Sequence, residues 1–287
     1  MPATSLTPPS LDTPAPIGVF DSGVGGITVL RSLYRHLPQE TFLYFGDTAR
    51  LPYGIRSEAE ILQYVREILT WMQSQGTKMV VMACNTSSAL ALKQVQDEFP
   101  FPVLGLILPA ARAAARRGHR VGVISTPATA TSHAYRNAIR ECDPGVAVFE
   151  VGCPEFVPLI EANRIHEPET RQIVSSYLQP LIEQGMDCLV YGCTHYPHLA
   201  PVVTSLLPRE VQLVDPAEHV CQAIAQELEA LGLRSHQPAH PTRFGVSGDP
   251  QQFATTAALW LGFEPPVEAI VLPHLSVSES LPQSVLE

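Results

Sequence analysis

Short apolar runs alternate along this chain with longer segments in which apolar and polar residues recur at helical spacing. Apolar runs of about four to eight residues between turn-forming residues are typical of buried strands. We expect strands at 16–20, 41–45, 78–83, 103–107, 121–124, 146–151, 189–192, 211–214, 244–246 and 267–272. We expect helices at 27–36, from a Ser57 cap to about 75, and at 87–98, 109–117, 131–141, 156–163, 169–184, from 197 onward, 217–231 and 251–262. This alternation predicts an α/β fold with parallel sheets covered by helices.

So many strands are unusual for a single sheet, and the chain contains an internal echo. Residues 17–26 and 121–130 each resemble a strand followed by a small polar turn. We therefore predict two similar parallel-sheet α/β domains with the active site in the cleft between them, where ligands commonly bind. The expected first domain contains residues 16–108 and 220–287, and the second contains residues 109–219. Residues 1–15, rich in Pro, Ser and Thr, are expected to be a disordered tail.

The composition argues against nucleic-acid-binding, membrane and secreted proteins. The chain has 287 residues, of which 45% are hydrophobic and 16% charged, and its formal net charge is −10. That acidic balance argues against general affinity for nucleic acid or anionic membranes. No apolar run approaches the roughly 18–20 residues needed to cross a bilayer, and no secretory signal is visible, so we expect a cytoplasmic protein. The 6 cysteines are then expected to be free thiols.

Lysine is nearly absent from the chain. Lys78 lies at the start of an expected strand and Lys93 in an expected helix, so neither is placed for Schiff-base chemistry. This argues against pyridoxal phosphate, and no cofactor is expected.

Two cysteines occupy matching positions. Cys84 follows the strand that begins at 78, Cys193 follows the strand that begins at 189, and both precede small or hydroxylic residues. Buried cysteines often act only as small hydrophobic residues, which is the alternative interpretation. At the carboxyl ends of parallel strands, however, side chains usually face a ligand. A helix N-terminus would also lower the pKa of each thiol toward neutrality.

Two thiols facing one carbon suggest a specific reaction. Inversion of a carbon centre requires a proton to leave one face and another to arrive at the opposite face. Two acid/base groups on opposite sides, one thiolate and one thiol, can do this and exchange roles with direction.

Other candidate groups lie beside the thiols. Asp21 closes the first strand, and His195 comes two residues after Cys193, within reach as its proton partner. Glu161 lies on an expected helix, where a solvated helix face is the alternative. The turn at 21–26 offers backbone amides to a carboxylate, but it matches neither the dinucleotide-binding nor the Walker pattern.

Metal binding is the main competing use of these residues. Cys193, His195 and His198 are suitable ligand types, and Cys84 could join them. The chain contains no C-x-x-C pair, so a zinc site is disfavoured and no metal is expected.

Several motifs, in order, closely resemble the glutamate racemases of the aspartate/glutamate racemase family. They are FDSGVGG (20–26), ARLPYG (49–54), ACNTSS (83–88), GCPEFVPLIE (152–161), YGCTHYP (191–197) and SGDPQQF (247–253). The resemblance covers roughly residues 16–272. It implies a cofactor-independent enzyme that interconverts L- and D-glutamate and supplies D-glutamate for peptidoglycan.

The resemblance also implies roles for individual residues. Cys84 and Cys193 are the expected catalytic acid/base pair, assisted by Asp21, Glu161 and His195. The residues expected to contact the substrate are Asp21, Ser22, Pro52, Tyr53, Gly54, Asn85, Thr86, Thr194 and His195. One threonine within 125–129 is expected to contribute as well, without a choice between them.

Other functions compete with this interpretation. The nearest is an aspartate racemase or another cofactor-free enzyme that moves an α proton. More distant ones are a metal-dependent hydrolase and a small-ligand binding protein with inert thiols. Some members of the family form dimers or respond to a cell-wall precursor, so a homodimer is one expected state, and the sequence does not choose among these.

Overall fold

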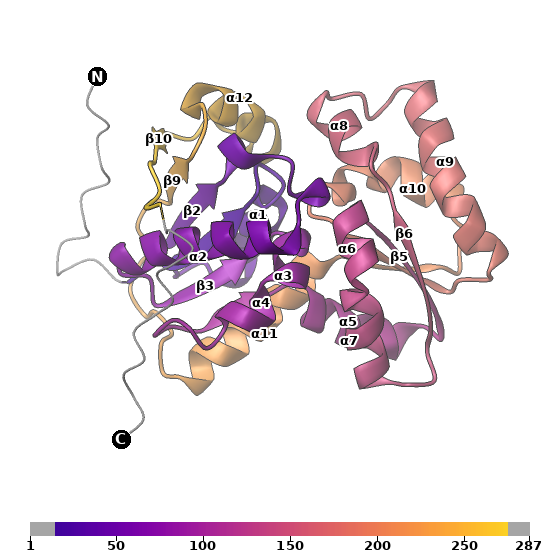
Figure 1. Ribbon diagram of the computed structural model, residues 1–287, viewed down its shortest axis with the longest axis horizontal. Helices are drawn as coiled ribbons and strands as arrows, with labels where there is room; N and C mark the ends of the chain where they lie inside the picture. The colour runs from indigo at the N-terminus through magenta and orange to yellow at the C-terminus, as the bar shows by residue number, and fades with distance from the viewer. Residues whose placement is uncertain (1–14, 275–287) are drawn as a thin grey trace.

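Two parallel β-sheets lie side by side in the computed structural model, which describes residues 15–274 (Figure 1). Within these residues, the first sheet has six strands in the order β10-β9-β2-β1-β3-β4 and the second has four in the order β6-β5-β7-β8. The first-sheet strands are β1 (Ile17–Asp21), β2 (Phe42–Gly46), β3 (Met79–Met82), β4 (Val103–Gly105), β9 (Arg243–Val246) and β10 (Val267–Ala269). The second-sheet strands are β5 (Arg120–Ser125), β6 (Ala147–Gly152), β7 (Cys188–Gly192) and β8 (Gln212–Val214).

Helices connect these strands and cover the sheets. The α-helices are α1 (Ile27–His36), α2 (Glu58–Ser74), α3 (Asn85–Leu90), α4 (Leu92–Val95), α5 (Ile107–Arg117), α6 (Pro127–Ser132), α7 (Ala134–Cys142), α8 (Phe156–Glu161), α9 (Pro168–Glu183), α10 (Ala200–Leu206), α11 (Pro216–Ala230) and α12 (Pro250–Leu261). Three short 3₁₀ helices are also described, η1 (Thr48–Arg50), η2 (Tyr53–Ile55) and η3 (Tyr196–Leu199). None of the helices in the described part of the chain combines the length and apolar character needed to cross a membrane.

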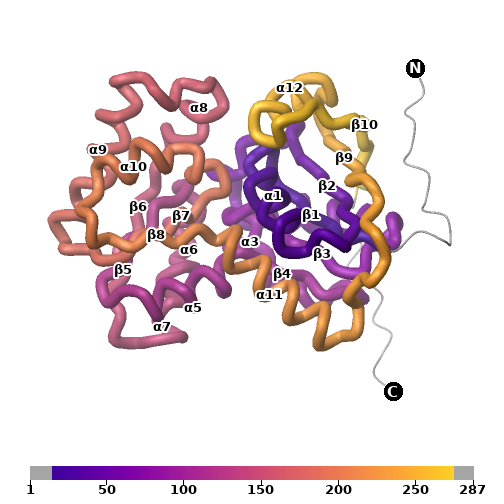
Figure 2. Tube along the Cα trace, turned by 180° about the vertical axis from the view of Figure 1, so that it is seen from behind, coloured from indigo at the N-terminus to yellow at the C-terminus, as the bar shows by residue number. Residues whose placement is uncertain are grey.

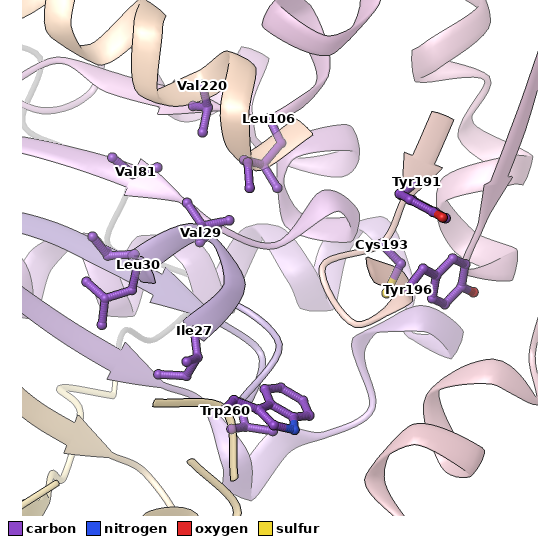
Figure 3. Packing of buried hydrophobic residues seen from close by; sticks show 14 of the residues in the cluster. Ile27, Val29, Leu30, Val81, Leu106, Tyr191, Cys193, Tyr196, Val220 and Trp260 are labelled. Atoms are coloured by element: carbon purple, nitrogen blue, oxygen red, sulfur yellow. The ribbon is translucent and has the colours of Figure 1, made fainter. Parts of the chain in front are cut away.

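The hydrophobic core has three parts, and the largest is shared by both sheets. It contains side chains from β1, β3, α1, α11 and α12 on one side and from β7, α8, α9 and α10 on the other. Figure 3 shows this shared cluster, with Ile27 and Leu30 from α1 beside the first sheet and with Tyr191 from β7 and Tyr196 from η3 in the region of the second sheet. A second cluster packs α2 and α4 on the first sheet, and a third packs α5 and α7 on the second sheet.

Strand residues alternate between these clusters. In β3, Val81 belongs to the shared cluster, whereas Val80 and Met82 belong to the cluster with α2. Near-continuous apolar strands are expected where both faces of a parallel sheet are covered. The observed structure confirms the predicted fold class, because two parallel α/β sheets are present and every described strand pair is parallel.

The chain crosses from the first sheet to the second after β4 and returns after β8, as the view from behind shows (Figure 2). The proposed domain boundaries at 108/109 and 219/220 fall inside α5 and α11, and these two helices contact each other. The division into domains therefore stays a proposal. Of the expected tail at 1–15, only residue 15 belongs to the described residues. The chain after residue 274 also lies outside them.

Several element boundaries differ from the sequence-based expectation. The expected helix at 131–141 begins at Pro127 and is interrupted at His133, which has a left-handed backbone with φ 54°. Thr126 caps the first of the two helices, α6, and Pro127 occupies its first turn. This Thr-Pro pair is a signal for the start of a helix, and the apolar periodicity used for the prediction did not include it. The expected helix at 87–98 starts two residues early and breaks at Ala91.

The segment after Cys193 also differs. The expected helix from 197 begins as the 3₁₀ helix η3, and the α-helix α10 starts only at Ala200. Pro201 lacks the amide hydrogen that would donate to the carbonyl of Pro197, so one regular α-helix cannot run through both positions. The strand expected at 103–107 ends at Gly105, because α5 starts at Ile107.

The N-terminus of α2 provides a test of local stability. Ser57 accepts a hydrogen bond from the Glu60 amide at 3.3 Å, and Glu60 accepts one from the Ser57 amide at 2.9 Å, which completes a capping box. We expect Ser57→Ala to lower the free energy of unfolding by about 1 kcal/mol and Ser57→Asp, which can still cap, to lower it much less. Urea denaturation followed by circular dichroism measures both, and equal losses in the two variants would contradict a capping role.

Candidate functional site

The sequence-predicted site residues lie at the carboxyl ends of equivalent strands in the two sheets. In the first sheet, β1 ends in Asp21 and its neighbour β3 leads into Cys84, the N-cap of α3. In the second sheet, β5 ends in Ser125 and its neighbour β7 leads into Cys193. Cys84 therefore follows the strand next to the one that ends in Asp21, and Cys193 follows the strand next to the one that ends in Ser125.

Direct contacts join these strand ends across the two sheets. The Thr194 hydroxyl donates to Asp21 Oδ2 at 3.2 Å, and the Thr28 hydroxyl donates to the Thr194 carbonyl at 3.1 Å. Gly25 packs so closely that a Cβ placed there would lie 2.4 Å from His195 Nδ1. Only a glycine allows this approach, so the predicted anion-binding turn of the first sheet lies against the Cys193 turn of the second.

Cys84 is buried beside an acidic group. Its side chain is 5% exposed, and its thiol contacts the Ser22 hydroxyl at 3.9 Å. Burial and the charge of Asp21 raise the pKa of Cys84 to about 12, although hydrogen bonds from Ser87 oppose the increase. The expected lowering by a helix N-terminus is therefore outweighed at Cys84. The charge of Cys193 contributes to this increase as well.

Cys193 has different neighbours. Its sulfur lies 3.8 Å from His195 Nδ1, and His195 Nε2 lies 3.2 Å from Glu161 Oε1 at the end of α8. Burial lowers the pKa of His195, but the bonds to Cys193 and Glu161 outweigh it and raise the pKa to about 10. An imidazole in this environment is protonated at neutral pH. The three groups form a relay from a half-exposed carboxylate to a buried sulfur.

Asp21 lies where the two sets of groups meet. It is fully buried, its Oδ1 accepts a hydrogen bond from the Gly23 amide at 2.8 Å, and its Oδ2 accepts the Thr194 hydroxyl. Burial raises the pKa of Asp21, although the charge of His195 and hydrogen bonds from backbone amides oppose the increase. This buried carboxylate therefore lies between the turn that follows β1 and the Cys193 turn.

Hydroxyl and amide groups gather where the start of α3, just after Cys84, meets α6 and α7. The hydroxyls of Thr86, Thr126 and Thr129 form a triangle with separations of 3.0, 3.2 and 3.0 Å. Asn85 Oδ1 accepts a hydrogen bond from Tyr135 at 2.6 Å, while its buried Nδ2 has no partner in the described part of the chain. Such donors can bind the carboxylate of a small substrate without a basic residue.

The same contacts identify residues that the sequence analysis did not choose. Both Thr126 and Thr129 join Thr86, and Tyr135 orients Asn85 from α7. A threonine followed by proline after a strand is a helix-start signal that could have indicated Thr126. Nothing in the local sequence indicated Tyr135, which is brought in by the packing of α7.

The Pro52–Gly54 segment approaches the threonine triangle through Gly54. A Cβ at Gly54 would lie 2.9 Å from Thr126 Cβ. The Tyr53 hydroxyl is directed elsewhere and donates to Asp47. The segment therefore lies at the site, but the side chain of Tyr53 is held behind it.

The remaining ligand-type residues do not gather into a metal centre. Among residues 15–274, no group of three or more His, Cys, Asp and Glu side chains is arranged to hold a metal ion. His198 stacks on Trp260 with 4.0 Å between ring centroids, and Cys153 donates to the Val151 carbonyl at 3.7 Å. These contacts give no support to the metal-dependent alternative.

Comparison with known proteins places this geometry in a family. The sequence profile of the Asp/Glu/hydantoin racemase family matches residues 17–224. The glutamate racemase of Trichormus variabilis is 64% identical over 265 residues, which cover 92% of this chain and 91% of that protein.

Solved structures agree with the sequence comparison. The structure of glutamate racemase isoform RacE1 from Bacillus anthracis superposes with a TM-score of 0.88 at 34% identity, covering 90% of this chain and 98% of that one. The structure of glutamate racemase from Francisella tularensis in complex with D-glutamate has a TM-score of 0.85 at 32% identity, covering 90% and 97%. The chain therefore belongs to the Asp/Glu/hydantoin racemase family and matches glutamate racemases over nearly its whole length.

Proposed function

We propose that this protein interconverts L- and D-glutamate without a cofactor, with one of Cys84 and Cys193 removing the α proton and the other donating its own proton to the opposite face. The observation that carries the proposal is the placement of two buried thiols on equivalent strand ends of two sheets, each with its own acid/base partners. The relatives that match nearly the whole chain are glutamate racemases, and one of their structures contains D-glutamate.

The reaction divides into two proton transfers. The thiolate of one cysteine removes the α proton of glutamate, and the electron pair of the broken C–H bond stays on the α carbon beside the carboxylate. The thiol of the other cysteine then donates its proton to the opposite face, which forms the other enantiomer and leaves that sulfur as thiolate. The reverse reaction uses the same steps with the roles exchanged.

The surroundings of the two sulfurs differ in a way that suits these roles. At Cys84, burial and the Asp21 charge favour the neutral thiol, which is a proton donor. At Cys193, a protonated His195 lies beside the sulfur and can balance a thiolate or supply a proton. We infer that Asp21 assists the Cys84 side and that Glu161, acting through His195, assists the Cys193 side.

Glutamate carries two carboxylates, and the proposed binding groups are neutral donors. They are Ser22, Asn85, Thr86 and Thr194, with backbone amides of the Pro52–Gly54 segment and the two strand-end turns. The unpartnered Asn85 Nδ2 is the clearest free donor among them. An unpaired buried amide is costly, so a bound carboxylate oxygen would satisfy it.

Supply of D-glutamate for peptidoglycan is the part of the proposal that rests on resemblance to the family. The cytoplasmic location rests on the sequence expectation, and a homodimer is one of the assembly states found in the family.

Solvent exchange tests the reaction itself. Purified protein incubated in D₂O with D- or L-glutamate, without added cofactor, should racemise it and introduce deuterium at the α carbon. Optical rotation and the NMR signal of the α proton follow the two events. Exchange with aspartate alone would indicate the neighbouring activity, and exchange with neither amino acid would contradict the proposal.

Substitution of either thiol tests the two-base mechanism. Cys84→Ser and Cys193→Ser should each reduce kcat for racemisation by a factor on the order of 10²–10⁴, because a serine hydroxyl is a far weaker acid/base at neutral pH. Cys142→Ser is the matched control, since Cys142 is exposed at the end of α7. Near-normal racemisation by either buried-site variant would rule out the paired-thiol mechanism.

The Glu161–His195 pair predicts the alkaline side of the pH profile. His195 holds its proton at neutral pH and loses it as the pH rises toward its pKa of about 10, so kcat should fall over that range. Glu161→Gln removes an interaction that raises this pKa, so the proton is lost sooner and the fall in kcat should move to lower pH. Glu169→Gln, on an exposed carboxylate paired with Arg164, is the control. An alkaline limb at the same pH in wild type and Glu161→Gln would argue against the relay.

A further inference from the structure

A buried polar network lies behind the loop that carries Pro52–Gly54, and its centre is Asp47. This residue follows β2 and is fully buried. Its Oδ1 accepts a hydrogen bond from the Ser247 hydroxyl at 2.7 Å, and its Oδ2 accepts Arg50 Nε at 2.6 Å and the Tyr53 hydroxyl. A carboxylate buried with this many donors is held in one position.

The network also contains a second buried carboxylate, that of Glu67, and Arg50 is the cation between the two. Arg50 bridges Asp47 to Glu67 on α2, and its guanidinium lies 4.2 Å from the centre of the Tyr64 ring. Burial raises the pKa of Glu67, but hydrogen bonds from Gln63 and Arg50 outweigh it and lower the pKa. Two carboxylates and one guanidinium are thus fixed between β2 and α2.

Backbone contacts connect this network to the strand ends of the site. The Asp47 amide donates to the Asp21 carbonyl at 3.0 Å, and the Ala49 amide donates to the Ser247 hydroxyl at 3.0 Å. At the far end of the loop, Gly54 lies against Thr126 of the second sheet. The loop therefore extends from the Asp21 strand end to the threonine triangle.

Tyr53 is the link between the network and the tip of the loop. Its side chain is 2% exposed, and the hydroxyl is bonded to Asp47 rather than directed at the threonines. Burial, reinforced by the charge of Asp47, raises the pKa of Tyr53 well above its usual range, so the phenol remains a hydrogen-bond donor. The sequence resemblance implied that Tyr53 contacts the substrate, but the Tyr53 hydroxyl instead binds Asp47 within its own loop.

We propose that Asp47 is a positioning residue, which holds the Tyr53 hydroxyl and thereby fixes the Pro52–Gly54 backbone against the substrate, while Arg50, Glu67 and Ser247 hold Asp47. This inference rests on the proposed glutamate racemisation. It assigns to the network an effect on substrate capture rather than on proton transfer, because its side chains form no hydrogen bond to Cys84 or Cys193 among the described residues.

Tyr53→Phe is the sharpest test, since it removes the bonded hydroxyl and keeps the ring. We expect KM for both glutamate enantiomers to rise about tenfold, the usual effect of losing a hydrogen bond to a charged group, with a much smaller change in kcat. A purely structural role would instead lower the thermal midpoint and the active fraction without changing KM. An unchanged KM, or a fall in kcat at constant KM, would overturn the proposal.

Tyr64→Phe is the matched control. Its ring lies 5.7 Å from that of Tyr53 and also packs against Arg50, but no hydrogen bond of its hydroxyl is found among the described residues. Its KM should stay at the wild-type value. Ser247→Ala removes one donor to Asp47 and should raise KM in the same direction but less than Tyr53→Phe, which provides a second test if Tyr53→Phe folds poorly.

A measurement without turnover separates this proposal from the proposed function. D-glutamate should protect the site thiols from iodoacetamide, and Tyr53→Phe should need more D-glutamate for half-protection by the same factor as the rise in KM. Wild-type protein that is protected but does not racemise would contradict the proposed function alone. Equal half-protection in wild type and Tyr53→Phe would contradict the positioning role alone.

Discussion

The contact between the two strand-end turns is the constraint on which this site depends. The bond from Thr194 to Asp21 and the close approach of Gly25 to His195 bring groups from two separate sheets within hydrogen-bonding distance. On the proposed mechanism neither sheet alone provides both acid/base groups, because one leads into Cys84 and the other into Cys193. The large apolar cluster that both sheets share holds the two sheets together and so stabilises this contact.

The quasi-symmetric fold supports a chemically unsymmetric pair. Equivalent positions in the sheets provide the two sulfurs, but the first has a buried carboxylate nearby and the second has an imidazole held by a carboxylate. Opposite faces of a substrate carbon present different groups to such a site, so identical surroundings are not needed. Equivalent positions in the two sheets account for the pairing of the sulfurs, and different neighbours give each sulfur its own surroundings.

The strand ends were predictable from the sequence because they depend on local signals. Apolar runs that end in Cys84, Cys193 and Asp21 mark the carboxyl ends of parallel strands, where side chains converge. Glu161 was a candidate on an expected helix, and the motif resemblance implied its role; its contact with His195 joins positions 34 residues apart. Distances between such positions depend on how α8 packs, which no local pattern encodes.

Other features were beyond local reasoning. The break at His133 depends on a left-handed backbone position. The partners of Asp47 come from the loop itself and from the segment after β9, and Arg50 also pairs with Glu67 on α2. The orientation of Tyr53 could not be inferred from its motif, because a tyrosine beside a site can point toward the ligand or away from it. The structure shows that the Tyr53 hydroxyl points toward Asp47, because this carboxylate is buried and requires hydrogen-bond donors.

The near-complete burial of both sulfurs, 5% and 6% exposed, has a kinetic consequence on the proposed mechanism. Each conversion leaves the thiol and the thiolate exchanged, so the protein that releases one enantiomer is prepared to accept that same enantiomer back. Conversion of a second molecule in the original direction requires the proton arrangement to be reset. Because the sulfurs have little contact with water, the protons on them can return to the original arrangement only through opening of the site or through His195 and Asp21. Until that happens, the free enzyme accepts the enantiomer that it has just released.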